Sequence, residues 1–363
     1  MKKILVAPAN FGLGHATRTI PIIRELQSKG HNIHIATSGA ALILLKKEFP
    51  DIICYELPDY PHGLQSAGTI TIKNLITEIS KITASYKKEN NVIKTIDKQN
   101  NYDMIISDGR YGAYIESKPS LIITHQLNFK LNKSLKIFEP LTAQYNKYYF
   151  NNFDRIIIPD NESRKISLAG DLSNVKISGL DKKAYYAGIL CSIKPVERTK
   201  DIDVLVSISG PEPCRSELED IIMKQIGDVR EKTKIILLGK PGDKMDYMLD
   251  ANTRIISHAD RNTMSELMGR SKTIVSRSGY TTIMELANLG HNNCFFIPTP
   301  GCFEQEYLAK KYLELGWFYS KIQKKLNLVS DLNQTNNYKG FPKMPRSEDN
   351  IKKLYEQILV KYL

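Results

Sequence analysis

The chain has 363 residues, a hydrophobic content of 42% and a formal net charge of +12. This composition excludes a disordered chain and a small disulfide scaffold, and the length exceeds the ~250–300 residues at which single hydrophobic cores stop growing, so we expect two domains. The five cysteines are scattered without a Cys-x-x-Cys pair, which favours a reducing cytoplasm over a disulfide framework or a zinc site.

Neither export nor membrane insertion is expected. The apolar run that follows Met1-Lys2-Lys3 is short, and no uncharged apolar stretch approaches the ~20 residues that span a bilayer. The positive charge is spread over both halves of the chain. A nucleic-acid protein more often gathers such charge into a stripe, whereas a diffuse excess also suits an anionic small ligand or an anionic membrane face. Charge alone does not decide among these partners.

The first half predicts a parallel sheet, because short β-branched runs alternate with amphipathic stretches in a βαβ rhythm. The predicted strands are residues 3–7, 32–37, 104–107, 120–124 and 155–158, and the predicted helices are 16–29, 40–49 and a long polar helix at about 70–98. We expect one Rossmann-like α/β domain over residues 1–180.

The pattern weakens over residues 181–200, which we interpret as a linker, and then restarts. The predicted strands are 204–208, 234–238, 254–257, 273–276 and 293–297, with helices that begin near Arg215, Thr263, Thr281 and Gln305. We expect a second α/β domain over residues 201–325, followed by a polar segment and a final helix over 326–363. Two doubly wound domains in tandem are the simplest interpretation.

Ligands of open α/β sheets bind beyond the carboxyl ends of the strands, so the first loop to inspect is Asn10-Phe11-Gly12-Leu13-Gly14-His15. Gly12 and Gly14 allow a close backbone approach to a ligand. The dinucleotide fingerprint fails at Thr17 and no P-loop pattern exists, which argues against a nicotinamide, flavin or P-loop enzyme. His15 is either a general base or a helix-capping histidine, and spacing alone favours neither.

Two further loops of the first half follow predicted strands. Asp108, before Gly109, either orients and charge-stabilises His15 or makes an Asx turn. His125 and Asn128 follow the next strand and are candidates to line the same site, although residue type alone slightly favours a structural histidine.

The second half offers an anion site at Arg277-Ser278-Gly279, before a predicted helix. A diphosphate there would be held by backbone N–H groups without a metal. Thr282 and Glu285 have the spacing of a capping box, which residue types favour over a contact between Glu285 and ribose hydroxyls.

The next loop ends in Glu304 and Gln305. These are either first-turn residues favoured by the helix dipole or a pair that binds sugar hydroxyls. Gly210, after the first strand of the second domain, is a weaker candidate to line the site.

Together these pieces resemble the GT-B glycosyltransferases of family 28, the MurG-like group, and most closely its uncharacterised members with Gly-x-Gly-His-Ala-Thr-Arg near the N-terminus. The resemblance covers about residues 1–320 and rests on Gly12–Arg18, His125–Asn128, Arg277–Gly279 with Thr282 and Glu285, and Glu304-Gln305 with Ala309. This chain has His125-Gln126-Leu127-Asn128 where the family has His-Glu-Gln-Asn, and Ser209-Gly210-Pro211-Glu212 where the family has a Gly-rich loop. The peptidoglycan acceptor of MurG is therefore not carried over.

The resemblance implies a GT-B fold, with two doubly wound domains that face each other across a cleft. It also implies an inverting, metal-independent transfer of a sugar from a nucleotide-diphosphate sugar to an acceptor hydroxyl, lipid-linked or on a glycan. Uridine with an N-acetylhexosamine is the family's commonest pairing. The resemblance implies that Ser278 and Gly279 bind the diphosphate and that Glu285 binds the ribose. It also implies that Glu304 and Gln305 bind the sugar, and that residues 258–264, which include Met264, bind the nucleobase. His15 is then the expected base, Asp108 its orienting acid, and Arg277 an aid to the leaving group.

Two alternatives stay open, namely a non-hydrolysing nucleotide-sugar epimerase of the same fold and a non-catalytic nucleotide-sugar-binding protein. Residues 129–150 combine lysines and aromatic side chains: Lys130, Lys133, Lys136 and Lys147 with Phe138, Tyr145, Tyr148 and Tyr149. Residue types slightly favour a solvated helix with a buried aromatic stripe over a patch that faces an anionic membrane. We expect no nucleic-acid partner, and a cytoplasmic protein with the inner face of the cell membrane as a peripheral contact. The sequence does not predict the oligomeric state.

Overall fold

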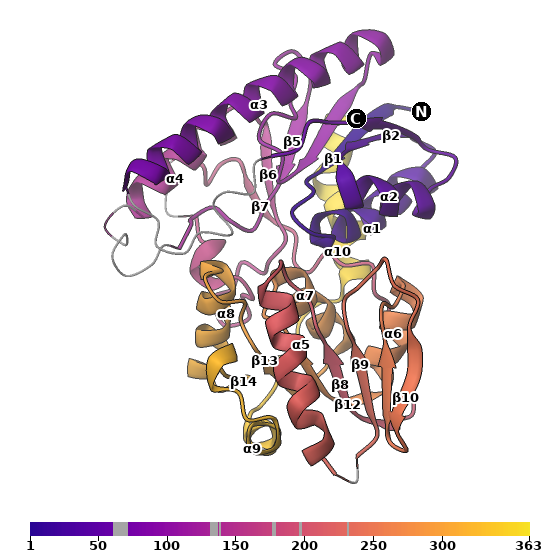
Figure 1. Ribbon diagram of the computed structural model, residues 1–363. Helices are drawn as coiled ribbons and strands as arrows, with labels where there is room; N and C mark the ends of the chain where they lie inside the picture. Colours follow the sequence, from indigo (N-terminus) through magenta and orange to yellow (C-terminus); the bar gives the residue numbers. More distant parts are fainter. Residues whose placement is uncertain (61–71, 131–136, 138, 176–178, 196–197, 231) are drawn as a thin grey trace. The chain divides into compact units, whose positions relative to one another are not determined.

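The computed structural model describes residues 1–60, 72–130, 137, 139–175, 179–195, 198–230 and 232–363 (Figure 1). It divides into two compact units. The first comprises residues 1–192 and 345–363, and the second comprises residues 193–344. Each unit is built around a sheet with seven described strands.

The sheet of the first unit is parallel throughout, in the order β3-β2-β1-β4-β5-β6-β7. Every residue of the central strands β4 and β5 is buried, as expected for parallel strands covered on both faces. The strands are β1 (Lys3–Pro8), β2 (Asn32–Thr37), β3 (Ile53–Glu56), β4 (Met104–Asp108), β5 (Ser120–Ile123), β6 (Arg155–Ile158) and β7 (Ala184–Tyr186). The strand order reverses between the neighbours β1 and β4, which is the topological switch point of a doubly wound sheet.

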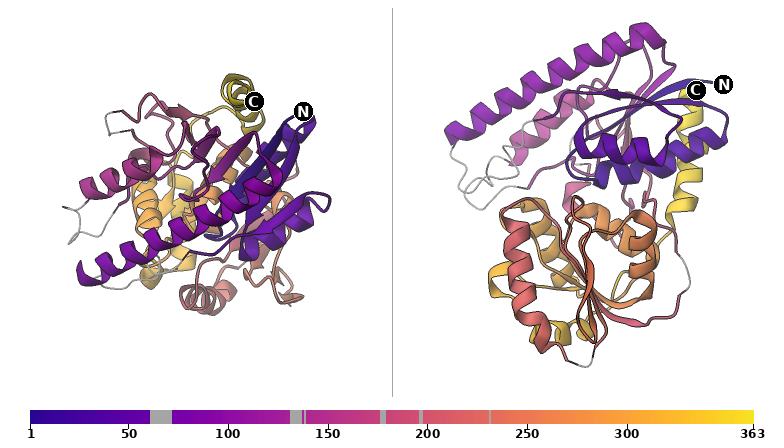
Figure 2. Two further views of the ribbon diagram at one scale, coloured as in Figure 1. Left: turned by 90° about the horizontal axis from the view of Figure 1, so that it is seen from above. Right: turned by 45° about the vertical axis from the view of Figure 1, so that its right-hand side comes forward.

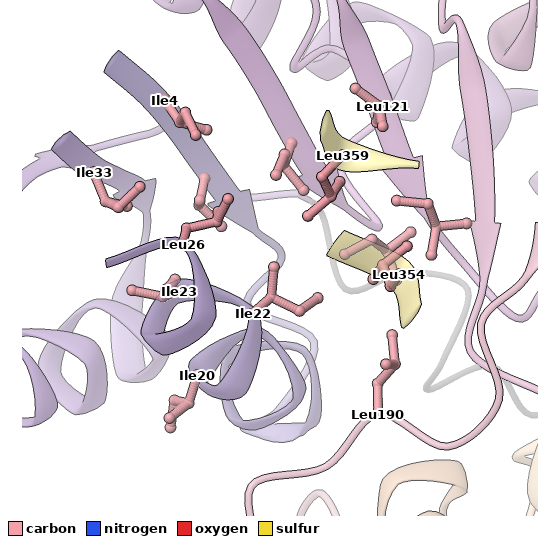
Figure 3. Close-up of a cluster of buried hydrophobic side chains, with 14 of the residues drawn as sticks. Ile4, Ile20, Ile22, Ile23, Leu26, Ile33, Leu121, Leu190, Leu354 and Leu359 are labelled. Atoms are coloured by element: carbon pink, nitrogen blue, oxygen red, sulfur yellow. The ribbon is translucent and has the colours of Figure 1, made fainter. Parts of the chain in front are cut away.

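The helices of the first unit are α1 (Gly14–Ser28), α2 (Gly39–Glu48), α3 (Ile72–Asn100), α4 (Glu139–Phe150) and α10 (Ser347–Gln357). The long helix α3 runs along the outside of this unit in both views of Figure 2. Side chains at helical spacing in α1, Ile20 and Ile23, share one buried cluster with Ile4 of β1 and Leu354 of α10 (Figure 3). The last helix of the chain therefore belongs to the core of the first unit.

The second unit repeats this design with one addition. Its order is β10-β11-β9-β8-β12-β13-β14, and all pairs are parallel except the antiparallel pair β10–β11. The strands are β8 (Ile202–Ser207), β9 (Lys234–Leu237), β10 (Asp246–Asp250), β11 (Thr253–Ile256), β12 (Ser271–Ser276), β13 (Cys294–Phe296) and β14 (Tyr319–Ser320). Its switch point lies between β8 and β12, the counterparts of β1 and β4.

The helices of the second unit are α5 (Cys214–Gln225), α6 (Arg261–Arg270), α7 (Tyr280–Leu289), α8 (Phe303–Glu314) and α9 (Leu328–Gln334). The core joins Val206, Ile236 and Val275 of the sheet to Leu328 and Leu332. Among the described helices of the whole chain, none combines the length and the apolar character that a membrane crossing requires.

The observed units differ from the sequence-based bounds at three places. Residues 184–186, inside the expected linker, form the short edge strand β7. Residues 328–334, inside the expected polar segment, form α9, whose Leu328 and Leu332 are one turn apart and buried in the second unit. The final helix returns to the first unit, where the Ser347 hydroxyl accepts from the Cys191 N–H and donates to the Cys191 carbonyl, each at 2.9 Å.

Candidate active site

Most of the residues singled out in the sequence lie at the switch points of the two sheets. In the first unit, the loop after β1 leads to His15, and β4 ends at Asp108. In the second unit, Gly210 follows β8 and Arg277-Ser278-Gly279 follows β12. These are the positions at which open α/β sheets bind their ligands.

The first unit brings His15 and Asp108 into direct contact. The Nδ1 atom of His15 lies 2.8 Å from Oδ1 of Asp108. His15 is the second residue of α1, whose N-cap is Leu13, so it does not cap the helix. Asp108 makes no Asx turn, because the N–H of Arg110 donates to Oγ of Ser107, and both carboxylate oxygens of Asp108 bind side chains. The His15 side chain keeps 18% of its surface exposed, whereas Asp108 is fully buried.

Arg18 is a third member of this group, and the sequence interpretation gave it no role. It is buried one helical turn after His15, and its Nε donates to Oδ2 of Asp108 at 2.6 Å while its Nη2 donates to Oδ1 of the same carboxylate. Its Nη2 also lies 2.9 Å from Nδ1 of His15. The three-residue spacing of His15 and Arg18 places both on one helix face, which is the sequence signal for this contact.

The charges of this group favour a neutral imidazole beside an ionised carboxylate. Burial lowers the pKa of His15 and Arg18 lowers it further, although Asp108 acts in the opposite direction. Burial by itself would raise the pKa of Asp108, but Arg18 and His15 hold it below its ordinary value. An ionised carboxylate only accepts, so we place the imidazole proton on Nδ1 and leave the lone pair of Nε2 for a substrate.

Gly109 leaves room for the imidazole. It adopts φ +72°, and a Cβ built on it would lie 2.7 Å from Cε1 of His15 and 3.0 Å from its Nδ1. Only glycine combines this backbone conformation with so close an approach. The ring centroid of Phe11 lies 6.2 Å from that of His15 and 5.6 Å from that of Tyr60, and sequence reasoning missed both aromatic contacts.

His125 and Asn128 have different surroundings. Nδ1 of the buried His125 lies 3.4 Å from Nη1 of Arg18, which places His125 next to the His15 group. The Asn128 amide instead donates to the backbone carbonyls of Asp171 and Asn174, at 2.9 and 2.7 Å. Asn128 therefore anchors a loop. Gly12, at φ +70°, and Gly14, the first residue of α1, shape the turn before His15.

In the second unit, Arg277 holds loops together. Its buried guanidinium donates to the carbonyls of Ser209, Cys214, Ile297 and Pro298 at 2.9 to 3.2 Å. Burial lowers the pKa of Arg277 to about 10, so the group stays charged at neutral pH. Four of its five N–H donors thus support the backbone instead of giving the direct aid to a leaving group that we expected.

Ser278 and Gly279 form the start of α7. The buried Ser278 hydroxyl donates to the carbonyl of Gln305 at 2.8 Å, so it is already engaged. Gly279 is the N-cap, and a Cβ built there would meet nothing within 4 Å. The open space before the first N–H groups of the helix, with the positive end of its dipole, suits an anion.

Glu285 is not part of a capping box. The helix begins at Tyr280 with Gly279 as N-cap, so Thr282 is its third residue and Glu285 lies in the second turn. The buried Glu285 carboxylate instead accepts from Nη2 of Arg261 at 3.2 Å. Burial raises the pKa of Glu285, and Arg261 opposes that shift. Arg261 and Met264 lie in the first turn of α6, within the stretch expected to meet a nucleobase.

Gln305, in the first turn of α8, also binds the loop that precedes this helix. Its Oε1 accepts from the Thr299 N–H at 2.9 Å. Glu304 lies half-buried in the first turn of α8, where the helix dipole favours an acid.

Thr299 was missed by the sequence interpretation. Only 3% of Thr299 is exposed, and its hydroxyl has no hydrogen-bond partner among the described residues. That hydroxyl lies 3.4 Å from the Cβ position of Gly210, which adopts φ +120°. A polar group without a partner therefore lies at the switch point of the second unit, and residue type gave no signal for it.

The two doubly wound sheets, each with its candidate residues at the switch point, have the architecture of the GT-B glycosyltransferases. The sequence profile of the family "Glycosyl transferase family 1" matches residues 2–329. The chain belongs to this family.

Relatives with this description are found among archaea. The chain is 27% identical over 341 residues to an uncharacterised glycosyltransferase of Methanosarcina mazei, an alignment that spans 87% of this chain and 84% of the relative. A second alignment, to an uncharacterised glycosyltransferase of the same species, is 28% identical over 169 residues and spans 44% of this chain and 43% of the relative.

Solved structures share the fold at low sequence identity. The calicheamicin glycosyltransferase CalG4 gives a TM-score of 0.64 at 12% identity, with 100% of this chain and 95% of that chain covered. MurG of Acinetobacter baumannii gives a TM-score of 0.62 at 13% identity, with 99% of this chain and all of that chain covered. At these identities the likeness shows the fold alone.

Proposed function

We propose that the protein transfers a sugar from a nucleotide-diphosphate sugar to an acceptor hydroxyl, with inversion at the anomeric carbon and without a metal. The observation that carries this proposal is the contact of His15 with a buried, ionised Asp108 at the switch point of the first unit. Uridine diphosphate with an N-acetylhexosamine is our first choice of donor. This choice follows from the resemblance of the sequence motifs to family 28.

In this proposal, Nε2 of His15 removes the proton from the acceptor hydroxyl. The acceptor oxygen forms a bond to the anomeric carbon while the bond from that carbon to the phosphate oxygen breaks, and the nucleotide diphosphate leaves with the electron pair. Asp108 holds the imidazole in the required tautomer and stabilises the imidazolium that forms. Arg18 fixes Asp108 through two hydrogen bonds, so the carboxylate cannot rotate away from His15.

The second unit would bind the donor. The first turn of α7 follows the open space at Gly279, and the positive end of the helix dipole would stabilise the charge that develops on the leaving diphosphate. Glu285, one turn further along, would accept hydrogen bonds from the ribose hydroxyls, while Arg261 binds its Oε1. Arg277 keeps the surrounding loops in place and adds a positive charge beneath them.

Donor binding is tested first, by thermal-shift screening against a panel of nucleotide sugars. A ligand that binds only the folded protein at 100 times its dissociation constant stabilises it by about 2.7 kcal/mol, so the correct donor stands out. Conversion of the donor in the absence of any acceptor would contradict a transferase and indicate an epimerase.

Catalysis is tested with His15→Ala, for which we expect turnover to fall by about 10²–10⁴-fold with the donor-induced thermal shift unchanged. Glu285→Ala should behave differently from His15→Ala, because it should reduce the donor-induced thermal shift. If His15→Ala retained wild-type turnover, His15 would not be the base.

For the acceptor, we propose a lipid-linked or glycan substrate used at the inner face of the cell membrane. The side chains of Leu141 and Tyr148 in α4 are exposed, as is that of Ile137 two residues before the helix, and they would contact the lipid. Lys133, Lys136 and Phe138 of the expected basic patch lie outside the described residues. Flotation with anionic vesicles at low and high salt tests this, and absence of binding at low salt would contradict it.

A further inference from the structure

A half-buried aromatic side chain lies beside the proposed base. Phe11 follows β1 at the switch point of the first unit and is not among the buried hydrophobic residues of the core. Its ring meets that of His15 in an edge-to-face arrangement, with the centroids 6.2 Å apart. Leu13, two residues further on, is 37% exposed. Large apolar side chains that stay accessible at a ligand-binding position are typical of a contact with the ligand.

The polar side chain of the same loop is already engaged. Asn10 is the only polar residue between the end of β1 and the start of α1. Its Nδ2 donates to Oδ2 of Asp59 at 2.9 Å, and its Oδ1 accepts from the Ala41 N–H at 3.1 Å. The other side chains that this loop offers next to the imidazole are therefore apolar. They match a group that presents an apolar face, because a polar face would lose its hydrogen bonds to water there.

Phe11 rests on Tyr60, which is itself fixed by a buried ion pair. The ring centroids of Phe11 and Tyr60 are 5.6 Å apart. The Tyr60 hydroxyl donates to Oε2 of Glu89, and Oε1 of Glu89 accepts from Nη1 of Arg110 at 2.5 Å. The Arg110 guanidinium also lies 5.4 Å from the centre of the Tyr60 ring. Burying two charges costs desolvation that offsets much of their attraction, but it holds Tyr60, and through it Phe11, in one position.

We propose that Phe11 determines the specificity for the acceptor, and that the acceptor hydroxyl is carried by a ring that stacks on the Phe11 side chain. This inference rests on the proposed function, in which Nε2 of His15 receives the proton of that hydroxyl. Aromatic side chains favour flat partners in offset or edge-on arrangements. The C–H face of a sugar ring and the face of an aromatic ring share this chemistry, whereas a linear alcohol lacks it. Because Phe11 and His15 are in contact, a hydroxyl at the rim of such a ring can meet the imidazole.

The binding test needs neither donor nor turnover. The phenylalanine rings and histidine imidazoles of the full chain are labelled for NMR, and the protein is titrated separately with phenol, methyl β-D-glucoside and n-propanol. We expect phenol or the glucoside to shift the signals of Phe11 and His15 with a common midpoint, which distinguishes an aromatic ring from a sugar ring as the bound group. The linear alcohol should shift neither signal. If neither ring probe shifts the Phe11 signals at up to about 100 mM, a concentration that detects millimolar binding, the proposal is overturned.

Substitutions separate the flat ring from its apolar character. Phe11→Leu keeps an apolar side chain without a flat face, and it should raise the midpoint of the His15 shift about tenfold. Phe11→Tyr keeps the ring and should bring the midpoint back to that of the wild type. Phe341→Leu is the matched control, because it makes the same change at a half-buried phenylalanine of the second unit, and it should have no effect. An equal midpoint in the wild type and in Phe11→Leu also overturns the proposal.

Turnover separates this inference from the proposed function. With the donor identified by thermal shift and the bound ring probe as acceptor, Phe11→Ala should raise the KM for the acceptor about tenfold and leave the donor-induced thermal shift unchanged. If no nucleotide sugar binds the wild type, the proposed function fails, whatever the ring probes do. If the wild type transfers sugar and Phe11→Ala has the same KM for the acceptor, Phe11 does not determine specificity and the proposed function stands.

Discussion

Gly109→Ala is the sharpest test of the geometry around His15. The new Cβ would lie 2.7 Å from Cε1 of His15, whereas carbon atoms in contact are about 3.5 Å apart. The imidazole must therefore move by roughly 0.8 Å, the difference between these distances. A shift of this size lengthens the 2.8 Å bond to Asp108 and takes Nε2 out of line with the acceptor.

The expected loss is about 10²-fold in turnover, the effect of a misplacement near 1 Å in an active site. The substitution also strains the backbone, because Gly109 has φ +72°, at a cost of about 1–2 kcal/mol. Gly30→Ala is the matched control. Gly30 has φ +78° at the end of α1, and its Cβ would meet nothing within 4 Å. It carries the same strain without a contact to His15.

Both variants are assayed for turnover of the donor identified by the thermal-shift panel, for melting temperature and for the imidazole signals of His15 by NMR. Gly30→Ala should lose stability and keep its turnover. Gly109→Ala should lose a similar amount of stability, lose turnover and shift the His15 signals. If the two variants had equal turnover, the position of the imidazole next to Gly109 would not matter and our account of the base would be wrong.

Four further predictions concern single groups. Because the pKa of His15 is lowered from 6.5, the acid limb of kcat/KM against pH should have its midpoint below 6.5, and a midpoint above that value contradicts a buried imidazole beside Arg18. Arg277→Met should destabilise the second unit by at least about 3 kcal/mol in urea denaturation, because four carbonyls lose their donor. Thr299→Val should raise stability by about 1 kcal/mol, because it removes a buried hydroxyl without a partner, and a loss of stability contradicts this. Arg261→Ala should raise the pKa of Glu285 further, measured by NMR titration of the carboxyl, since Arg261 opposes the effect of burial.

The fold was predictable from the sequence because parallel strands that are buried on both faces consist of runs of β-branched residues. The predicted strands at residues 32–37 and 155–158 have the bounds of β2 and β6. β10 escaped prediction, because a strand exposed on both faces has no apolar alternation to recognise. α9 escaped because its two buried leucines stand alone in a polar stretch.

The part of the candidate site that follows from the strand topology alone was predictable. The rule that ligands bind beyond the carboxyl ends of strands places His15 and Asp108 on neighbouring loops, and the structure has them in contact. Arg18 needed the additional step of reading His15 and residue 18 as one helix face. The capping-box interpretation of Glu285 was wrong because it depended on the first residue of the helix, and helix ends are the least certain part of a sequence-based assignment.

The contacts of Arg277 with backbone carbonyls could not be predicted from its residue type. Its counterpart in the first unit, Arg110, makes the same kind of contact, and the two together explain the role of such an arginine. Each follows a strand that neighbours the first strand of its sheet. Each donates to the backbone at the end of that first strand, Arg277 to Ser209, two residues after β8, and Arg110 to Pro8, the last residue of β1, at 2.9 Å. Carbonyls at the ends of parallel strands have no partner in the ladder, and leaving them unpaired in a buried loop costs free energy. A buried guanidinium satisfies several of them at once and fixes the loops relative to one another. In both units the arginine thus ties together the loops at the switch point.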